Sequence, residues 1–181
     1  CNIYITGYSD LFGSGANTIL IKYNSTGELK WISNFNGTAN NNSSAQAITI
    51  DLNGNIYICG TCRNIGTDND IMLLKFNLGG SLIWARTYSG VTGAEELAVK
   101  VITDLSGNIY TTGYTFSPGF SKNVISFKFD SQGQLIWNRT YNGDLNGRDE
   151  GIDIGLYNDN LIVSGISSHD ENSNYFDYLL I

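Results

Sequence analysis

The chain has 181 residues, enough for one domain with a sizeable buried core. Its formal charge of −7, from 17 acidic and 10 basic residues, argues against nucleic acid as a partner, because most of the surface would repel phosphate groups. The sequence contains no run of about 18 apolar residues and therefore predicts no membrane-spanning helix. A count of 21 glycines against a single proline favours strands joined by tight turns.

Short strand-like segments recur along the chain at a fixed spacing. The first, NIYITGYS from Asn2, returns as NIYICGTC from Asn55, as NIYTTGYT from Asn108 and more loosely as NLIVSGIS from Asn160. A tryptophan and a lysine each recur at intervals of 53 residues. A period of this length is typical of repeat architectures, in which each unit buries its apolar faces on its neighbours. These anchors are Trp31, Trp84 and Trp137, and Lys22, Lys75 and Lys128.

Each complete repeat contains four such segments. After the segment at Asn2, the chain continues with ILIKY from Ile19, LKWISNF from Leu29 and AQAITID from Ala45. We name the AQAITID type segment A, the NIYITG type B, the ILIKY type C and the LKWISNF type D. The A–B and C–D links are short and contain glycine, as β-hairpins require, whereas the B–C and D–A links are long. Each repeat is therefore predicted to be an antiparallel meander in the order A, B, C, D.

Several of these segments are apolar almost throughout, which indicates a sheet covered on both faces. A four-stranded meander covered on both faces is a β-propeller blade, so we predict an all-β fold: an arc of about four blades and about 14 strands. Small residues open segment A, at Ala45, Ala98 and Gly151, and place it innermost. The tryptophans of segment D are expected to lie between adjacent blades. The lysines of segment C are expected to pack their stems and to extend the ammonium group to solvent or to a carboxylate.

We predict one β-propeller segment over residues 1–181, with repeat units at about 1–37, 38–90, 91–143 and 144–181. Because the first unit lacks segment A and the last lacks segment D, we interpret the first and last blades as incomplete. Cys1 occupies the turn position of Gly54 and Gly107, which fits this interpretation. The remaining blades of a longer parent chain would then be partners of this segment.

The combined pattern G-N-I-Y-x-T-G-Y, K-[YF]-[ND]-x-x-G-x-L-x-W and T-Y-x-G resembles the SBBP-type repeat family, whose name denotes seven-bladed β-propellers. The resemblance implies a propeller in a secreted or surface-attached microbial protein, and the family has no shared catalytic motif to carry over. The segments TGELKW, GGSLIW and QGQLIW are also similar to the repeats of quinone-cofactor propeller dehydrogenases. Those enzymes need calcium-binding acidic residues at the axis, and no such set can be matched here.

Two residue types raise the question of redox or metal chemistry. Cys59 and Cys62 have the C-x-x-C spacing of a redox dithiol or of half a zinc site. The other repeats have Thr or Ser at these positions, and the pair lies on a predicted strand and not at a helix N-terminus, so we interpret both as structural. A disulfide between two of the three cysteines stays open for an exported protein. His169 is the single histidine, in a polar loop, and is interpreted as solvated.

Oxygen-bearing side chains offer weak candidates for a calcium site and for glycosylation. None of the acidic stretches fits the full calcium-loop pattern, and polar turn residues are the plainer interpretation. Five N-x-[ST] sequons fall in or near predicted turns or on the outer strand and modestly favour an extracellular or cell-surface location. The calcium candidates are Asp68, Asp70, Asp144, Asn146, Asp149 and Glu150, and the sequon asparagines are Asn24, Asn36, Asn41, Asn42 and Asn138.

The long B–C and D–A links should emerge on one face of the arc, where a rigid scaffold would present binding residues. We therefore expect a non-catalytic scaffold for protein or glycan binding or for surface display, with no catalytic residue and no cofactor assigned. The alternative is a propeller enzyme, either a quinoprotein-like oxidoreductase or a glycoside hydrolase, with its site over the central channel. The candidate binding residues are Phe12, Asn17, Asp68, Phe116, Phe120, Asp144, Glu150 and Tyr175.

Overall fold

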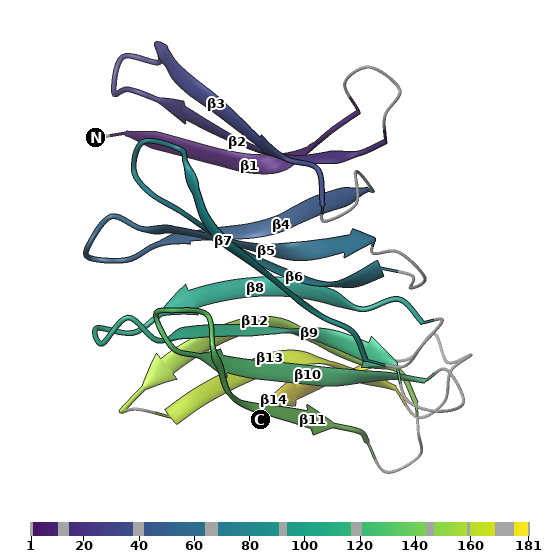
Figure 1. Ribbon diagram of the computed structural model, residues 1–181. Helices are drawn as coiled ribbons and strands as arrows, with labels where there is room; N and C mark the ends of the chain where they lie inside the picture. The colour runs from purple at the N-terminus through teal and green to yellow at the C-terminus, as the bar shows by residue number, and fades with distance from the viewer. Residues whose placement is uncertain are drawn as a thin grey trace.

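The computed structural model describes residues 2–10, 15–37, 42–63, 69–90, 94–116, 121–143, 147–158, 160–168 and 176–180. All regular structure in these ranges is β, and it forms four antiparallel sheets (Figure 1). None of the described residues forms a helix long and apolar enough to cross a membrane. The predicted all-β arc of propeller blades is confirmed.

The strands of each sheet follow one another in chain order, so every sheet is a meander. We number the blades 1 to 4 along the chain. Within the described residues, blade 1 contains no segment A strand and blade 4 contains no segment D strand. Blade 1 contains β1 (Ile3–Ser9), β2 (Asn17–Tyr23) and β3 (Leu29–Phe35); blade 2 contains β4 (Ser43–Ile50), β5 (Ile56–Arg63), β6 (Asn69–Phe76) and β7 (Leu82–Tyr88); blade 3 contains β8 (Leu97–Thr103), β9 (Ile109–Phe116), β10 (Lys122–Phe129) and β11 (Leu135–Tyr141); blade 4 contains β12 (Asp149–Tyr157), β13 (Asn160–Ser168) and β14 (Phe176–Leu180).

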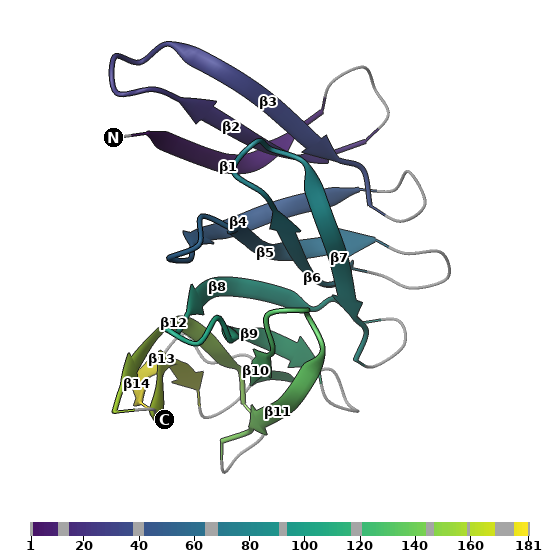
Figure 2. The same ribbon diagram turned by 60° about the vertical axis from the view of Figure 1, so that its left-hand side comes forward.

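The sheets follow one another face to face along the arc, and Figure 2 shows the same succession from a second direction. Strands β4, β8 and β12 contact one another from blade to blade and form the inner edge. The small residues Ala45 and Ala98 are buried there, as expected for crowded inner strands. The outer strands β7 and β11 lie at the opposite edge of their sheets.

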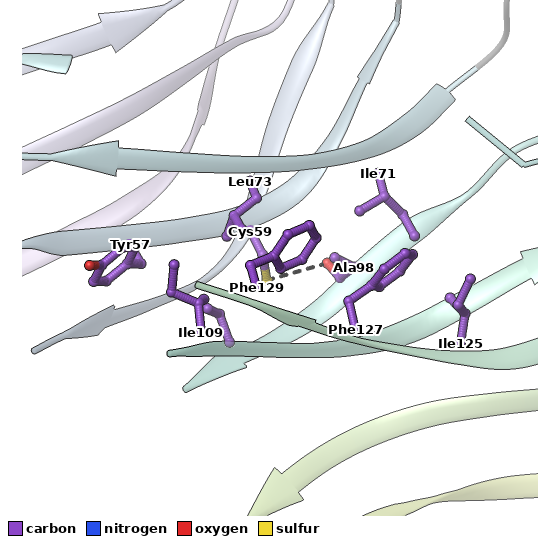
Figure 3. Packing of buried hydrophobic residues seen from close by; sticks show 10 residues of the cluster. Tyr57, Cys59, Ile71, Leu73, Ala98, Ile109, Ile125, Phe127 and Phe129 are labelled. Atoms are coloured by element: carbon purple, nitrogen blue, oxygen red, sulfur yellow. Dashed lines mark hydrogen bonds between the residues drawn. The ribbon is translucent and has the colours of Figure 1, made fainter. Parts of the chain in front are cut away.

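Blade 2 is buried on both faces, which explains its nearly continuous apolar strands. Ile56 and Ile58 pack toward Leu20 of blade 1. Tyr57 and Cys59, which alternate with them along β5, pack toward blade 3. Figure 3 shows the apolar cluster between blades 2 and 3, in which Ile71 and Leu73 of β6 also pack with residues of blade 3. These blade 3 residues are Ile109, Ile125, Phe127 and Phe129. Each of these core clusters is therefore formed by residues of two adjacent blades.

The tryptophan of each of the first two blades packs on a turn glycine of the next blade. Trp31 lies against Gly80, where an added Cβ would come within 2.9 Å of Cε3. Trp84 lies against Gly133, where it would come within 3.0 Å of Cζ2. Both glycines have positive φ angles, of 84° and 76°. We call this contact the Trp–Gly seam; it confirms the expected position of these tryptophans between blades, with their rings half-buried.

The expectation for the lysine column is wrong at Lys75. Its side chain is buried, and Nζ donates to the carbonyl of Ser131 in the next blade at 3.0 Å. The same nitrogen lies 5.2 Å from the centre of the Tyr57 ring. A backbone carbonyl and an aromatic face therefore take the place of the expected water or carboxylate, because the next blade's turn closes over the lysine.

A β-bulge recurs at one position of every inner strand. The register against segment B shifts between Ala45 and Ala47, between Ala98 and Lys100, and between Gly151 and Asp153. The strand opposite carries a glycine at this point, and a Cβ at Gly113 would lie 1.9 Å from the carbonyl oxygen of Leu97. The glycine of the NIYxTG segment is therefore required by the close approach of the bulged inner strand.

Candidate binding site on the loop face

The strand ends that the long connections join lie at one end of the sheets, and the tight A–B and C–D turns lie at the other (Figure 1). This arrangement follows from the meander order, since alternate connections of a meander emerge at opposite ends. We call the end with the long connections the loop face. It is where the sequence predicts binding residues.

Five side chains from blades 3 and 4 meet on the loop face. Lys122, the first residue of β10, lies 2.7 Å from Oε1 of Glu150, and Nε of Arg148 lies 2.7 Å from the same oxygen. The ammonium group also lies 3.7 Å from the centre of the Tyr114 ring. Tyr114 in turn meets the Phe116 ring edge-on, with ring centres 6.0 Å apart. We call these five residues the Tyr114 cluster.

The charges in this cluster set the ionisation of Glu150. Its side chain is 11% exposed, and burial alone would raise its pKa. Hydrogen bonds from Arg148 and Lys122, together with their positive charges, outweigh burial and lower the pKa of Glu150. Burial, followed by the charges of Glu150 and Glu95, raises the pKa of Tyr114, which therefore stays a neutral phenol at physiological pH.

The equivalent positions one blade earlier form a different site. Asn42, Arg63, Asn69 and Glu95 line a polar hollow of about 150 Å³, in which Asn69 Nδ2 donates to Glu95 Oε1 at 3.1 Å. One repeat of 53 residues later, Phe116 occupies the position of Arg63 and Lys122 that of Asn69. The seam contacts recur from blade to blade, whereas the loop-face side chains change. This contrast is expected where packing positions are fixed by the fold and surface positions are free to carry recognition.

Asp149, a calcium candidate, accepts hydrogen bonds from two groups of the protein, one of them in the connection between β11 and β12. It is fully buried, and its Oδ2 accepts the N–H of Gly143 at 2.8 Å, while Oδ1 accepts the Ser167 hydroxyl. Glu150 is bonded to two cations, as described above. Asp70 is buried at the start of β6. In the ranges that the structure describes, no three His, Cys, Asp or Glu side chains gather into a metal-binding group.

The structure brings together two of the sequence-predicted binding residues, Phe116 and Glu150, through Lys122 and Tyr114. Asn17 is a half-buried residue at the start of β2. Sequence reasoning missed Tyr114, Lys122 and Arg148; the alternation of side chains along a strand could have paired Tyr114 with Phe116. The predicted residues Phe12, Asp68, Phe120, Asp144, Asn146 and Tyr175 lie outside the described residues, so the expectations for them stay predictions.

A comparison with family models matches residues 37–65 to the SBBP family, described as a β-propeller repeat. This range includes strands β4 and β5 of blade 2. The chain contains an SBBP β-propeller repeat. The match confirms the resemblance to this family that the sequence analysis found. A search of curated proteins found no match.

The two described cysteines are structural parts of the SBBP repeat. Cys59 and Cys62 are free thiols, both fully buried, and they belong to different core clusters on opposite faces of blade 2. Burial raises the pKa of each thiol to about 12. The pair therefore lacks both the approach and the reactivity of a redox dithiol. Cys1 and His169 lie outside the described residues.

The sequon asparagines occupy different settings in the blades. Asn36 and Asn42 are exposed, and Asn138 is half-buried on β11. Asn24 lies in the β2–β3 turn, where Oδ1 accepts the backbone N–H groups of Thr26 and Glu28. Asn41 lies outside the described residues.

Proposed function

We propose that this chain is a non-catalytic binding scaffold whose loop face recognises a glycan. The observation that carries the proposal is the polar hollow of Asn42, Arg63, Asn69 and Glu95. Its amide, guanidinium and carboxylate groups supply the donors and acceptors that sugar hydroxyl groups need. Rigid blades hold these groups in place, which limits the entropy lost on binding.

The Tyr114 cluster extends this surface into the next blade. Glu95 connects the two sites, because it bonds to Asn69 and also lies near enough to Tyr114 to raise its pKa, after burial and Glu150. Phe116 supplies a half-buried apolar ring beside the polar groups. A ligand longer than one sugar unit could contact both sites.

A printed panel of neutral and acidic oligosaccharides tests the proposal, with the purified 181-residue chain as probe. We expect saturable binding to a subset of the panel, reduced about tenfold or more by Arg63→Ala and by Glu95→Gln. Lys30→Ala is the matched control, because Lys30 is exposed on β3 and bonds to Glu28 near the β2–β3 turn. Binding that both loop-face variants retain in full would refute the assignment, and binding of a protein in place of glycans would favour the protein ligand.

The enzymatic alternative is tested on the same panel. Oligosaccharides that bind are incubated with the chain and analysed by mass spectrometry. The scaffold proposal expects every ligand to be recovered intact, whereas cleaved or oxidised products would favour the hydrolase or the oxidoreductase.

We further propose an extracellular or cell-surface location, in which a glycan-binding face would meet its ligands. The exposed sequon residues Asn36 and Asn42 are consistent with it. Fractionation of the source cells, followed by immunodetection, tests this location. A signal confined to the cell interior would contradict it.

A further inference from the structure

A hollow lies at the Trp–Gly seam between blades 2 and 3, the two blades that contain four strands each. Its floor is apolar and buried, since Ile71 and Leu73 of β6 are 2% exposed and Phe129 of β10 is 7% exposed. Tyr88 of β7 and Leu135 of β11 belong to its rim. The hollow measures about 230 Å³. An apolar cavity of about 150 Å³ accepts benzene, so this space is sufficient for an aromatic ring with a short substituent.

Arg86 is the one charged side chain among the described residues that line this hollow. It is half-buried, and its guanidinium group lies over the Trp84 ring, with Cζ 5.3 Å from the ring centre. The ion pairs within the described ranges all join other residues, so Arg86 has no carboxylate partner among them. A cation beside apolar walls and without an anion favours a ligand that brings a negative charge.

Three backbone carbonyls hold the Arg86 guanidinium group in place. Nε donates to Gly133 and Nη2 to Gln132, both at 3.2 Å, and Nη1 donates to Ala85 at 3.0 Å. A guanidinium group has five N–H donors, one on Nε and two on each terminal nitrogen. Within the described structure, one donor therefore remains on Nη1 and one on Nη2. This is the pair that a carboxylate can accept in a bidentate contact, and the group is already oriented for it.

The seam between blades 1 and 2 shows that this charge is not needed to join two blades. Ser33 occupies the position of Arg86 one repeat earlier, and its hydroxyl donates to the carbonyl of Gly80 at 2.6 Å. Gly80 is the counterpart of Gly133, so a neutral serine makes the same bond across the seam as the arginine does. A structural role across the seam therefore leaves the positive charge of Arg86 and its two remaining donors unexplained.

We infer that the hollow beside Arg86 binds a small organic acid that has a compact apolar body and one carboxylate. The apolar body packs on the floor of Ile71, Leu73 and Phe129. The carboxylate accepts the two remaining N–H donors of Arg86. The hollow shares no lining residue with the polar hollow of the loop face, so its occupation does not require glycan binding.

Phenylacetate is the probe, and phenylacetamide, a neutral compound of nearly the same shape, is the matched control ligand. Each is titrated into the isotope-labelled 181-residue chain. Binding is followed by the NMR shifts of the Arg86 Nε–H group, the Trp84 indole and the methyl groups of Leu73 and Leu135. We expect saturable shifts at these groups with phenylacetate, and binding about tenfold or more weaker with phenylacetamide. Acetate, which lacks the apolar body, should also bind about tenfold or more weakly.

Variants of the protein locate the site. Arg86→Ser, which reproduces the arrangement of blade 1, should weaken phenylacetate binding about tenfold or more. Arg139→Ser, the same substitution one repeat later, should leave the affinity measured at Arg86 unchanged. The comparison of acid with amide on the unaltered chain keeps the test decisive if Arg86→Ser fails to fold. Absence of saturable shifts, equal affinity for the acid and the amide, full binding by Arg86→Ser, or shifts centred on the loop face would overturn the inference.

Discussion

The ring of Trp84 lies directly on Gly133, so that the turn of one blade closes the apolar face of the blade before it. A Cβ at Gly133 would meet three ring atoms at 3.0–3.1 Å, and the residue also has a φ of 76°. Glycine is therefore required at position 133 for two reasons, the backbone conformation and the contact with the ring. The two contributions can be measured separately, because the same turn occurs at Gly27 with no ring next to it.

We predict that Gly133→Ala destabilises the protein more than Gly27→Ala. Gly27 has the same turn position and a φ of 79°, yet a Cβ there would meet no atom within 4 Å. Gly27→Ala should cost about 1 kcal/mol from the positive φ alone. Gly133→Ala should cost about 1–3 kcal/mol more, because the tryptophan must move. Urea unfolding measures both changes, and equal losses would show that the ring contact contributes nothing.

The bulge glycine gives a second matched pair. Gly113→Ala places a Cβ 1.9 Å from the Leu97 carbonyl, whereas Gly7, at the same motif position in blade 1, has open space around it. Gly113→Ala should therefore lower the unfolding free energy by about 3 kcal/mol or prevent folding, and Gly7→Ala should change it by less than about 1 kcal/mol. Thermal unfolding of the two variants distinguishes them. Similar melting temperatures would contradict the close approach of the bulged strand.

Asp104 should make stability depend on pH. Burial alone would raise its pKa, but hydrogen bonds from the Asn108 side chain, from the Tyr110 hydroxyl and from backbone N–H groups lower it below the ordinary value of 3.8. Since the folded pKa is the lower one, the stabilisation is complete above about pH 4–5 and is lost as pH falls through the folded value. Asp51 repeats this arrangement in blade 2 and should contribute with the same sign.

The measurement is urea unfolding at pH 7 and at pH 3. Asp104→Asn should lower stability at pH 7 and reduce the loss between the two pH values. Asp130→Asn is the control, because Asn77 already makes the same two backbone hydrogen bonds at that turn position in blade 2. An unchanged pH dependence in Asp104→Asn would contradict the assigned role.

Glu150→Gln tests whether the Tyr114 cluster is held by charge. The substitution removes the negative charge that Lys122 and Arg148 share at Oε1 in a half-buried setting, so we expect a loss of about 1–3 kcal/mol at pH 7. Glu28→Gln, in an exposed pair with Lys30, should change stability by less than about 0.5 kcal/mol. If both substitutions had the same small effect, the cluster would be an ordinary surface feature.

The repeat spacing was sufficient to predict the strands, their meander order and the position of the tryptophans between blades. It could not predict the bulge opposite Gly113, because a bulge depends on how two backbones meet and not on side-chain periodicity. It also misplaced the ammonium of Lys75, whose acceptor is a carbonyl 56 residues away. The Tyr114 cluster was missed because it depends on contacts between blades: Lys122 and Glu150 lie in different blades and meet only when the blades stack.

The proposal that the loop face binds a glycan is tested most directly by titrating an oligosaccharide that binds on the panel into the isotope-labelled chain and following the backbone NMR shifts. We predict shifts concentrated at Arg63, Asn69, Glu95 and the Tyr114 cluster, with the A–B and C–D turns unaffected. Shifts concentrated at those turns, or along the inner strands β4, β8 and β12, would contradict a binding site on the loop face.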